Sequence, residues 1–157
     1  MGEARFCPWC AAALVEAEHS GRRRPGCSCG YVHWDNPLPV VAALVEHEGA
    51  VILARNKGWP EGWYGLVTGF LEKGETPEEG VLRELREELG LTGEIVRLIG
   101  VYAFPQRHEL IVAYHVRAQG TVALGEEIEA VKRIPPDKLR AWPFGTGLAV
   151  ADWLGSR

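Results

Sequence analysis

Three glutamates in the stretch RELREELG are spaced so that an α-helix would bring them onto one face: Glu84, Glu87 and Glu88. Carboxylates held this close together repel one another and raise each other's affinity for protons. A hard divalent cation relieves that repulsion, and an all-oxygen ligand set suits Mg²⁺ or Mn²⁺ rather than zinc. The spacing is therefore compatible with a metal site that binds substrate phosphates. By itself, it is more typical of a solvated helix face with ion pairs, for example between Glu79 and Arg83.

The helix that would carry these glutamates has clear boundaries in the sequence. Thr76 is placed to cap the amino end, Pro77 fits the first helical position, and Glu79 completes a capping box. Gly90 fits the left-handed position that ends a helix. A core-facing stripe lies beside the acidic face and consists of Val81, Leu82, Leu85 and Leu89.

The stretch Gly69–Leu91 as a whole resembles the Nudix box. The box reads Gly, five residues, Glu, seven residues, then Arg-Glu-aliphatic-any-Glu-Glu-any-Gly-aliphatic. Every fixed position is filled, by Gly69, Glu75, Arg83, Glu84, Leu85, Glu87, Glu88, Gly90 and Leu91. The stretches NPLPVVAALV, GAVILARN and GWYGLVTGF look like the strands and the Gly-Trp loop that precede the box in this family. The resemblance covers roughly residues 36–154.

The Nudix resemblance implies a fold and an activity. The fold would be an α/β/α sandwich with a mixed sheet. The activity would be Mg²⁺- or Mn²⁺-dependent hydrolysis of a nucleoside diphosphate linked to another moiety, such as NADH, FAD or ADP-ribose. Metals neutralise charge on the attacking and leaving oxygens in such reactions. Three alternatives stay open: a hydrolase of nucleoside triphosphates, an enzyme that removes an NAD cap from RNA, and a non-catalytic nucleotide-binding regulator.

The resemblance also implies roles for particular residues. The catalytic metal ligands would be Glu84, Glu87 and Glu88, with the Gly69 carbonyl as a further ligand. Glu75 and Arg83 would be structural, pairing to hold the loop on the helix. A carboxylate must deprotonate the attacking water. The candidates for this base are Glu87 and, on a later loop, Glu126, Glu127 and Glu129.

Residues outside the box fall into strands and one further helix. The runs Val40–Glu46 and Ala50–Arg55 predict two strands joined by a turn at His47–Gly49. The stretches GEIVRLIGVYAF and LIVAYHVRAQG also predict strands, and a closing helix is expected from about Thr146 to Leu154. Strands mixed with two helices predict a layered α/β domain.

All four cysteines lie in the first 29 residues, at Cys7, Cys10, Cys27 and Cys29. This clustering indicates metal ligation rather than disulfides. Residues 1–35 resemble a zinc ribbon, a segment that structural Zn²⁺ can fold, ahead of a Nudix domain at 36–157; the combination resembles the NADH pyrophosphatase branch. One residue rather than two separates Cys27 from Cys29, so the geometry adapts, His33 substitutes, or the site is degenerate. The stretch GRRRPG is expected to be a turn.

Substrate contacts are expected from residues near the predicted cleft. Arg55 ends a strand where relatives place a basic residue near the phosphates, and Arg107 is a second basic candidate. Trp63, Tyr102 and Phe104, together with Tyr64, could stack on a base. We expect Trp142–Phe144 to be a core-packing turn before the last helix.

Charge and hydropathy exclude several function classes. The 157 residues carry a net charge of −4, whereas duplex-binding proteins are usually basic, so we expect a small nucleotide substrate rather than a nucleic-acid partner. No apolar run reaches the length of a membrane span. The start MGEARFCPWC lacks the features of a signal peptide, so we expect a cytoplasmic protein. Relatives implied by the resemblance are often homodimers.

Overall fold

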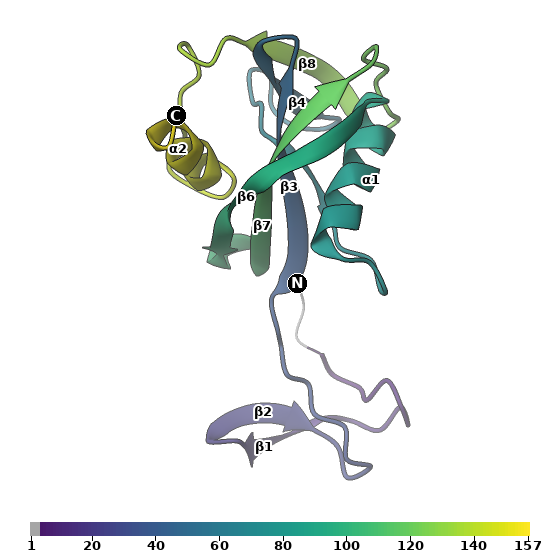
Figure 1. The fold of residues 1–157 in the computed structure, drawn as a ribbon. Coiled ribbons are helices and arrows are strands. Elements are labelled where there is room, and N and C mark those ends of the chain that lie inside the picture. The colour runs from purple at the N-terminus through teal and green to yellow at the C-terminus, as the bar shows by residue number, and fades with distance from the viewer. Residues whose placement is uncertain (1–3) are drawn as a thin grey trace. The chain divides into compact units, whose positions relative to one another are not determined.

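A computed structural model of the chain describes residues 4–157 (Figure 1). Its internal contacts divide the chain into two compact units, one ending at Asn36 and the other beginning at Pro37. The smaller unit contains an antiparallel hairpin of β1 (Val15–His19) and β2 (Arg22–Gly26). The expectation of a turn at GRRRPG is therefore wrong. The turn lies at Ser20 and Gly21, whose φ angles of 53° and 75° suit a tight hairpin, and the arginines pair with β1.

The larger unit is built on a six-stranded mixed sheet. Its main path runs β6-β7-β3-β4-β8, and β5 pairs with β3. The central strand β3 is parallel to β7 and antiparallel to β4 and β5. The strands are β3 (Leu38–His47), β4 (Ala50–Asn56), β5 (Val67–Phe70), β6 (Thr92–Phe104), β7 (Glu109–Gln119) and β8 (Ile128–Ile134).

Strand β3 is buried on both faces, which explains its continuous apolar run. Alternate side chains enter two separate cores, because successive residues of a strand point to opposite faces. Val41, Ala43 and Val45 belong to one core, and Val40, Ala42 and Leu44 belong to the other. The predicted turn into β4 is present, with positive φ at Glu48 and Gly49.

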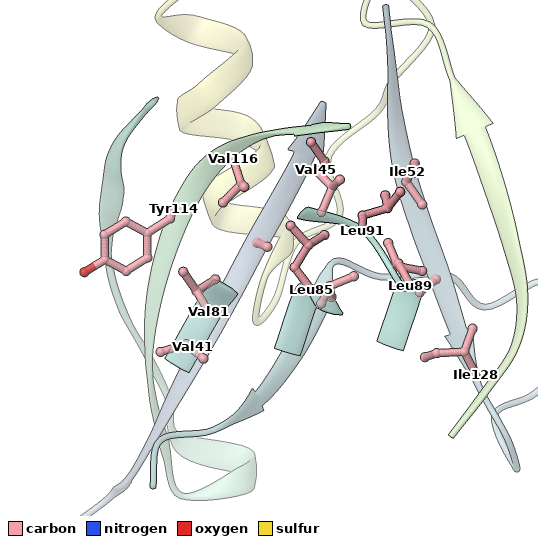
Figure 2. Close-up of a cluster of buried hydrophobic side chains, with 14 residues drawn as sticks. Val41, Val45, Ile52, Val81, Leu85, Leu89, Leu91, Tyr114, Val116 and Ile128 are labelled. Atoms are coloured by element: carbon pink, nitrogen blue, oxygen red, sulfur yellow. The ribbon is translucent and has the colours of Figure 1, made fainter. Parts of the chain in front are cut away.

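Helix α1 (Pro77–Leu89) covers one face of the sheet, and its caps are those predicted. Thr76 Oγ1 accepts from the Glu79 amide, and the Glu79 carboxylate accepts in return from the Thr76 amide. Gly90 closes the helix at φ 66°. Val81, Leu85 and Leu89 are fully buried against the sheet (Figure 2).

Helix α2 (Gly147–Gly155) covers the opposite face (Figure 1). Ala149, Val150 and Trp153 of this helix are buried in the second core. The larger unit is therefore the α/β/α sandwich with a mixed sheet that the sequence predicts. No helix in residues 4–157 is long and apolar enough to cross a membrane.

The sequence does not predict β8 or the short 3-10 helix η1 (Pro105–Arg107). The apolar residues of β8 do not alternate strictly with polar ones: Ile128, Ala130, Val131 and Ile134. Pairing with β4 makes this segment a strand, because tertiary contacts override weak local preference.

Candidate functional site

The three glutamates of α1 line a cavity of about 630 Å³. We call it the acidic cavity, since seven glutamates and two arginines line it: Glu72, Glu84, Glu87, Glu88, Glu109, Glu126, Glu127, Arg83 and Arg107. The Glu88 residue is 5% exposed, and its Oε2 is buried without a hydrogen-bond partner. The Glu87 side chain is 59% exposed at the other extreme. The helix thus offers one buried and one solvent-facing carboxylate to the same cavity.

Arg83 joins the loop before α1 to the helix acids. Its Nε and Nη2 donate to the two oxygens of Glu75 at 2.6 and 3.1 Å, and Nη2 also donates to the Phe70 carbonyl. Its Nη1 donates to Glu84 at 2.6 Å and to Glu87 at 3.0 Å. One guanidinium therefore fixes the loop and two of the clustered carboxylates at the same time.

Burial and mutual repulsion change the proton affinity of these acids. The pKa of Glu88 is raised to about 8, first by burial and then by the charges of Glu84, Glu127 and Glu87. Burial also raises the pKa of Glu84, against the hydrogen bond from Arg83. The pKa of Glu75 is lowered by its hydrogen bonds from Arg83 and from the Glu72 amide. The glutamates of the cavity thus outnumber its arginines, and burial and repulsion favour the protonated form of Glu88.

The loop between β7 and β8 brings further acids to the cavity. The amides of Ala123 and Gly125 donate to the carbonyls of Leu89 and Glu88 at the end of α1. A Cβ on Gly125 would lie 2.1 Å from the Glu87 carbonyl oxygen, so only glycine permits this approach. Glu127 lies two residues after Gly125, and its charge raises the pKa of both Glu84 and Glu88.

Gly69 lies on β5, paired with Val41 of β3, and also lines the acidic cavity. A Cβ there would lie 1.9 Å from the Glu84 carboxyl carbon. The backbone of β5 and the Glu84 carboxylate are therefore in close contact, which a larger residue would prevent.

A second cavity, of about 430 Å³, adjoins the first. Val40, Trp59, Thr68, Arg107 and Glu109 line both cavities. We call the second one the aromatic cavity, because six aromatic side chains line it: Trp59, Trp63, Tyr64, Phe104, Trp142 and Phe144. An apolar chamber lined by aromatic rings therefore lies beside a chamber lined by carboxylates.

The family comparison decides between the possible interpretations of this acidic helix. Residues 36–150 match the NUDIX domain, which is most of the chain. The chain belongs to the Nudix family. Its box therefore occupies the loop and helix that line the acidic cavity, as the sequence resemblance implies.

Similar proteins support this membership. The chain is 37% identical over 117 residues to an NAD-capped RNA hydrolase NudC of Chromobacterium violaceum, covering 74% of this chain and 43% of that protein. It is 30% identical over 152 residues to a protein of the same name from Stutzerimonas stutzeri, covering 95% and 54%. The chain thus spans about half the length of the curated relatives that it matches.

A solved Nudix hydrolase from Nitrosomonas europaea shares the fold, with a TM-score of 0.77 and 26% identity, over 87% of this chain and 80% of that one. An ADP-ribose pyrophosphatase from Streptococcus suis has a TM-score of 0.63 at 20% identity, over 77% and 92%. At 20% identity, the similarity to the Streptococcus suis protein shows a shared fold only.

Four of the six candidate substrate residues line the aromatic cavity: Trp63, Tyr64, Phe104 and Arg107. The other two, Arg55 and Tyr102, line neither cavity. Arg55 pairs with Glu129 of β8 at 3.4 Å, and the Tyr102 hydroxyl donates to Asp152 of α2 at 2.7 Å. Glu129, one of the candidate bases, pairs with Arg55 and does not line the acidic cavity.

Sequence reasoning did not select Trp59, Glu109, Trp142 and Phe144 as site residues. Trp142 packs against the second core, as expected of a core-packing turn, but it also lines the aromatic cavity with Phe144. Phe144 stacks on Phe104, which lies 40 positions earlier in the chain, and their ring centroids are 6.3 Å apart. Aromatic side chains next to Gly and Pro were the available signal, but local sequence cannot show which rings share a chamber.

The four cysteines of the smaller unit form one cluster. All four Sγ atoms lie within 4.8 Å of one another, with Cys7 to Cys29 at 3.5 Å and Cys10 to Cys27 at 3.4 Å. Tetrahedral zinc with Zn–S bonds of about 2.3 Å needs sulfurs about 3.8 Å apart. The backbone therefore accommodates the short Cys27–Cys29 spacing. His33 is not part of this cluster and lies instead 3.6 Å from Asp35.

Proposed function

We propose that this Nudix domain hydrolyses the pyrophosphate bond of a nucleoside diphosphate linked to another moiety, with bound Mg²⁺ or Mn²⁺. One observation carries the proposal. The clustered carboxylates of α1 meet at the acidic cavity, and the buried Glu88 Oε2 there has no protein partner. An unpartnered buried carboxylate oxygen is costly unless a cation satisfies it.

The donor set fits a hard divalent cation. Glu84, Glu87 and Glu88 would supply oxygen ligands, and Gly69 of β5, whose carbonyl would be a further ligand, lies close to the Glu84 carboxylate. Carboxylates whose protons are held by burial and repulsion release them when a cation binds. When bound, the metal supplies positive charge against the attacking and leaving oxygens of the phosphates.

The protein groups then have separate tasks in the reaction. Water attacks one phosphorus, the bridging P–O bond breaks, and the water proton passes to a carboxylate. Glu87 is exposed enough to accept that proton directly. Glu127 is the second candidate, because it reaches the same cavity from the β7–β8 loop. Arg83 holds Glu75, Glu84 and Glu87 in place, as a positioning residue.

The aromatic cavity supports a substrate with a ring at one end, such as a dinucleotide. Its shared wall with the acidic cavity allows a base to stack while the phosphates remain near the carboxylates. A second candidate substrate is RNA that carries an NAD cap, which is favoured by the names of the relatives from Chromobacterium violaceum and Stutzerimonas stutzeri. A purely regulatory role is disfavoured, since a sensor has no need of the complete carboxylate set.

The central test is the change Glu87→Gln, which removes one charge and keeps the shape. We expect Mg²⁺-dependent turnover to fall by about 100-fold or more, because the loss of a group that stabilises charge in the reaction commonly has this effect. The matched control is Glu94→Gln on β6, whose exposed carboxylate makes one long contact with Arg117. Equal activity of the Glu87 variant and the control would refute the metal site.

The substrate class requires a separate screen. Product formation is measured by chromatography with NAD, NADH, FAD, ADP-ribose, diadenosine polyphosphates, nucleoside triphosphates and a 5′-NAD-capped oligonucleotide, because cleavage of a dinucleotide gives two monophosphates and no free phosphate. Hydrolysis of dinucleotides above triphosphates supports the proposal. If none of these compounds is hydrolysed, the result would favour a non-catalytic nucleotide-binding regulator.

A further inference from the structure

The loop between β7 and β8 is anchored at both of its ends. At its start, Nε2 of the buried His47 on β3 donates to the Gly120 carbonyl at 2.9 Å. At its end, the amide of Lys57, just after β4, donates to the Glu127 carbonyl at 2.8 Å. The next residue, Ile128, is buried in the core beneath α1. The segment of chain that carries Glu127 is therefore held by several distant parts of the sheet.

The middle of this loop caps the carboxyl end of α1. The last carbonyls of an α-helix have no partner within the helix, so other groups must satisfy them. The Gly125 amide donates to the Glu88 carbonyl at 2.9 Å. The Ala123 amide donates to the Leu89 carbonyl, also at 2.9 Å. We call these two hydrogen bonds the clip. The clip ties the loop to the turn of the helix that carries Glu87 and Glu88.

The absence of a side chain at Gly125 makes the clip possible. A Cβ on this residue would lie 2.1 Å from the Glu87 carbonyl oxygen and 3.2 Å from the Glu88 Cα. Both atoms belong to the helix backbone, which cannot turn aside as the end of a flexible side chain does. Since non-bonded atoms pack at about 3.5 Å, the loop would have to retreat from the helix by more than about 1 Å.

Such a retreat would displace Glu127, which lies two residues after Gly125. Glu127 lines the acidic cavity together with Glu84, Glu87 and Glu88. Its charge acts on two of these glutamates, since it raises the pKa of Glu84 and of Glu88. A displacement of about 1 Å in a reacting group can lower a rate by about 100-fold. The clip therefore controls a distance on which the reaction depends.

We propose that Gly125 is a positioning residue, which holds Glu127 beside the carboxylates of α1 through the clip. The inference rests on the proposed function, in which Glu127 is a candidate acceptor for the proton of the attacking water. Neither Ala123 nor Gly125 lines the acidic cavity or the aromatic cavity, so the clip acts only through other residues. Loss of the clip should therefore slow the chemical step and leave substrate binding in the aromatic cavity unchanged.

The change Gly125→Ala tests the residue by steady-state kinetics. We expect kcat to fall by about 10-fold or more, with a change in KM below about threefold. Glu127→Gln should also lower kcat, and the double variant should lose no more than the weaker of the two single variants. The control for stability is Ile134→Ala at the far end of β8, a truncation that destabilises the fold. This residue lines neither cavity, so kcat should be kept.

Three kinetic results would overturn the inference: additive losses in Gly125→Ala and Glu127→Gln, a raised KM with unchanged kcat in Gly125→Ala, or equal kcat in Gly125→Ala and Ile134→Ala. If Gly125→Ala does not fold, a variant with one glycine inserted after Leu124 takes its place. Loops tolerate insertions, and the extra residue breaks the register of the clip without a new side chain. The same fall in kcat is expected.

Amide hydrogen exchange followed by NMR tests the clip without metal or substrate. The amides of Ala123 and Gly125 should exchange at least about 100-fold more slowly than those of an unstructured chain. This protection should be lost in Gly125→Ala and kept in Ile134→Ala. Exchange at the rate of an unstructured chain in the wild type would overturn the inference, because the clip would then be open most of the time.

Binding of Mn²⁺ alone, measured by calorimetry, separates this inference from the proposed function. Gly125→Ala and Glu127→Gln should each weaken Mn²⁺ binding by about threefold or more, because each removes negative charge from the cavity. The double variant should bind no more weakly than the weaker single variant. If Mn²⁺ binds in this way but no pyrophosphate is hydrolysed, the proposed function fails and the positioning of Glu127 stands. If dinucleotides are hydrolysed but Gly125→Ala binds Mn²⁺ as the wild type does, the inference fails alone.

Discussion

The guanidinium of Arg83 and the carboxylate of Glu75 form a two-point ion pair, with Nε to Oε1 at 2.6 Å and Nη2 to Oε2 at 3.1 Å. The pair connects the loop before α1 to the helix itself. Both side chains are 19% exposed, so water competes little for the contact. This contact fixes the position of the loop relative to the clustered glutamates of α1.

Replacing Arg83 by Lys should reduce activity although the charge is kept. A lysine ammonium cannot make both contacts with Glu75 and also reach Glu84 and Glu87. We expect kcat/KM to fall by about 10-fold or more, as removal of positioning groups commonly does. Glu75→Gln should give a similar loss, and the double variant should lose little further. Independent, fully additive losses in the two single variants would contradict a shared role. Steady-state kinetics with thermal melts of all three variants provide the data.

Replacing Gly69 by Ala should impair the same site through the backbone. The new Cβ would occupy the position of the Glu84 carboxylate, at 1.9 Å from its carboxyl carbon. Glu84 must move, so we expect a higher Mg²⁺ concentration for half-maximal activity. Gly155→Ala at the end of α2 is the matched control, because nothing lies within 4 Å of its Cβ position. A Mg²⁺ titration in which Gly69→Ala matches this control would show that the contact is unimportant.

The cysteine cluster should hold one zinc ion per chain. The four sulfurs lie at distances that suit tetrahedral ligation, and small segments use such ions in place of a large core. Elemental analysis of the purified protein should give close to one equivalent. Cys10→Ser should lower zinc content, whereas His33→Ala should not, since His33 lies outside the cluster. A folded and active protein without zinc would show that the site is degenerate.

His115 should make the stability of the larger unit depend on pH. It is 8% exposed, its Nε2 lies 2.8 Å from Glu46, and its ring packs edge-on against Trp153 of α2. Burial lowers its pKa, opposed by Glu46 and assisted by the charges of Arg97 and Arg117. A depressed histidine pKa means that the unfolded chain takes up the proton first as pH falls.

The stabilising effect of a neutral His115 is therefore complete above its ordinary pKa of about 6.5 and is lost as pH falls below that value. Between about pH 7.5 and pH 5.5, the wild type should lose more free energy of unfolding than His115→Gln. The glutamine amide still donates to Glu46 but cannot be protonated in this range. Urea unfolding at the two pH values measures the difference. Equal losses would mean that another group controls the acid sensitivity.

Local features of the sequence predict much of the fold. Thr76, Pro77 and Gly90 set the ends of α1, because capping depends on residues within one turn of each other. The apolar run of β3 indicates a strand buried on both faces. The hairpin of β1 and β2 is not predicted, because its residues show no clear strand pattern. Strand β8 is not predicted either, since pairing with the distant strand β4 decides its conformation.

The sequence by itself determined the family, the acidic helix and the four clustered cysteines, because each depends on residue types at fixed spacings. The tertiary structure decided which side chains share a chamber. In the structure, Arg55 pairs with Glu129, and Tyr102 donates a hydrogen bond to Asp152. The aromatic cavity is lined by residues that are far apart in the sequence: Trp59, Glu109, Trp142 and Phe144. Their sequence separation is too large for any local pattern to report, since sheet pairing and helix packing set the distances between them.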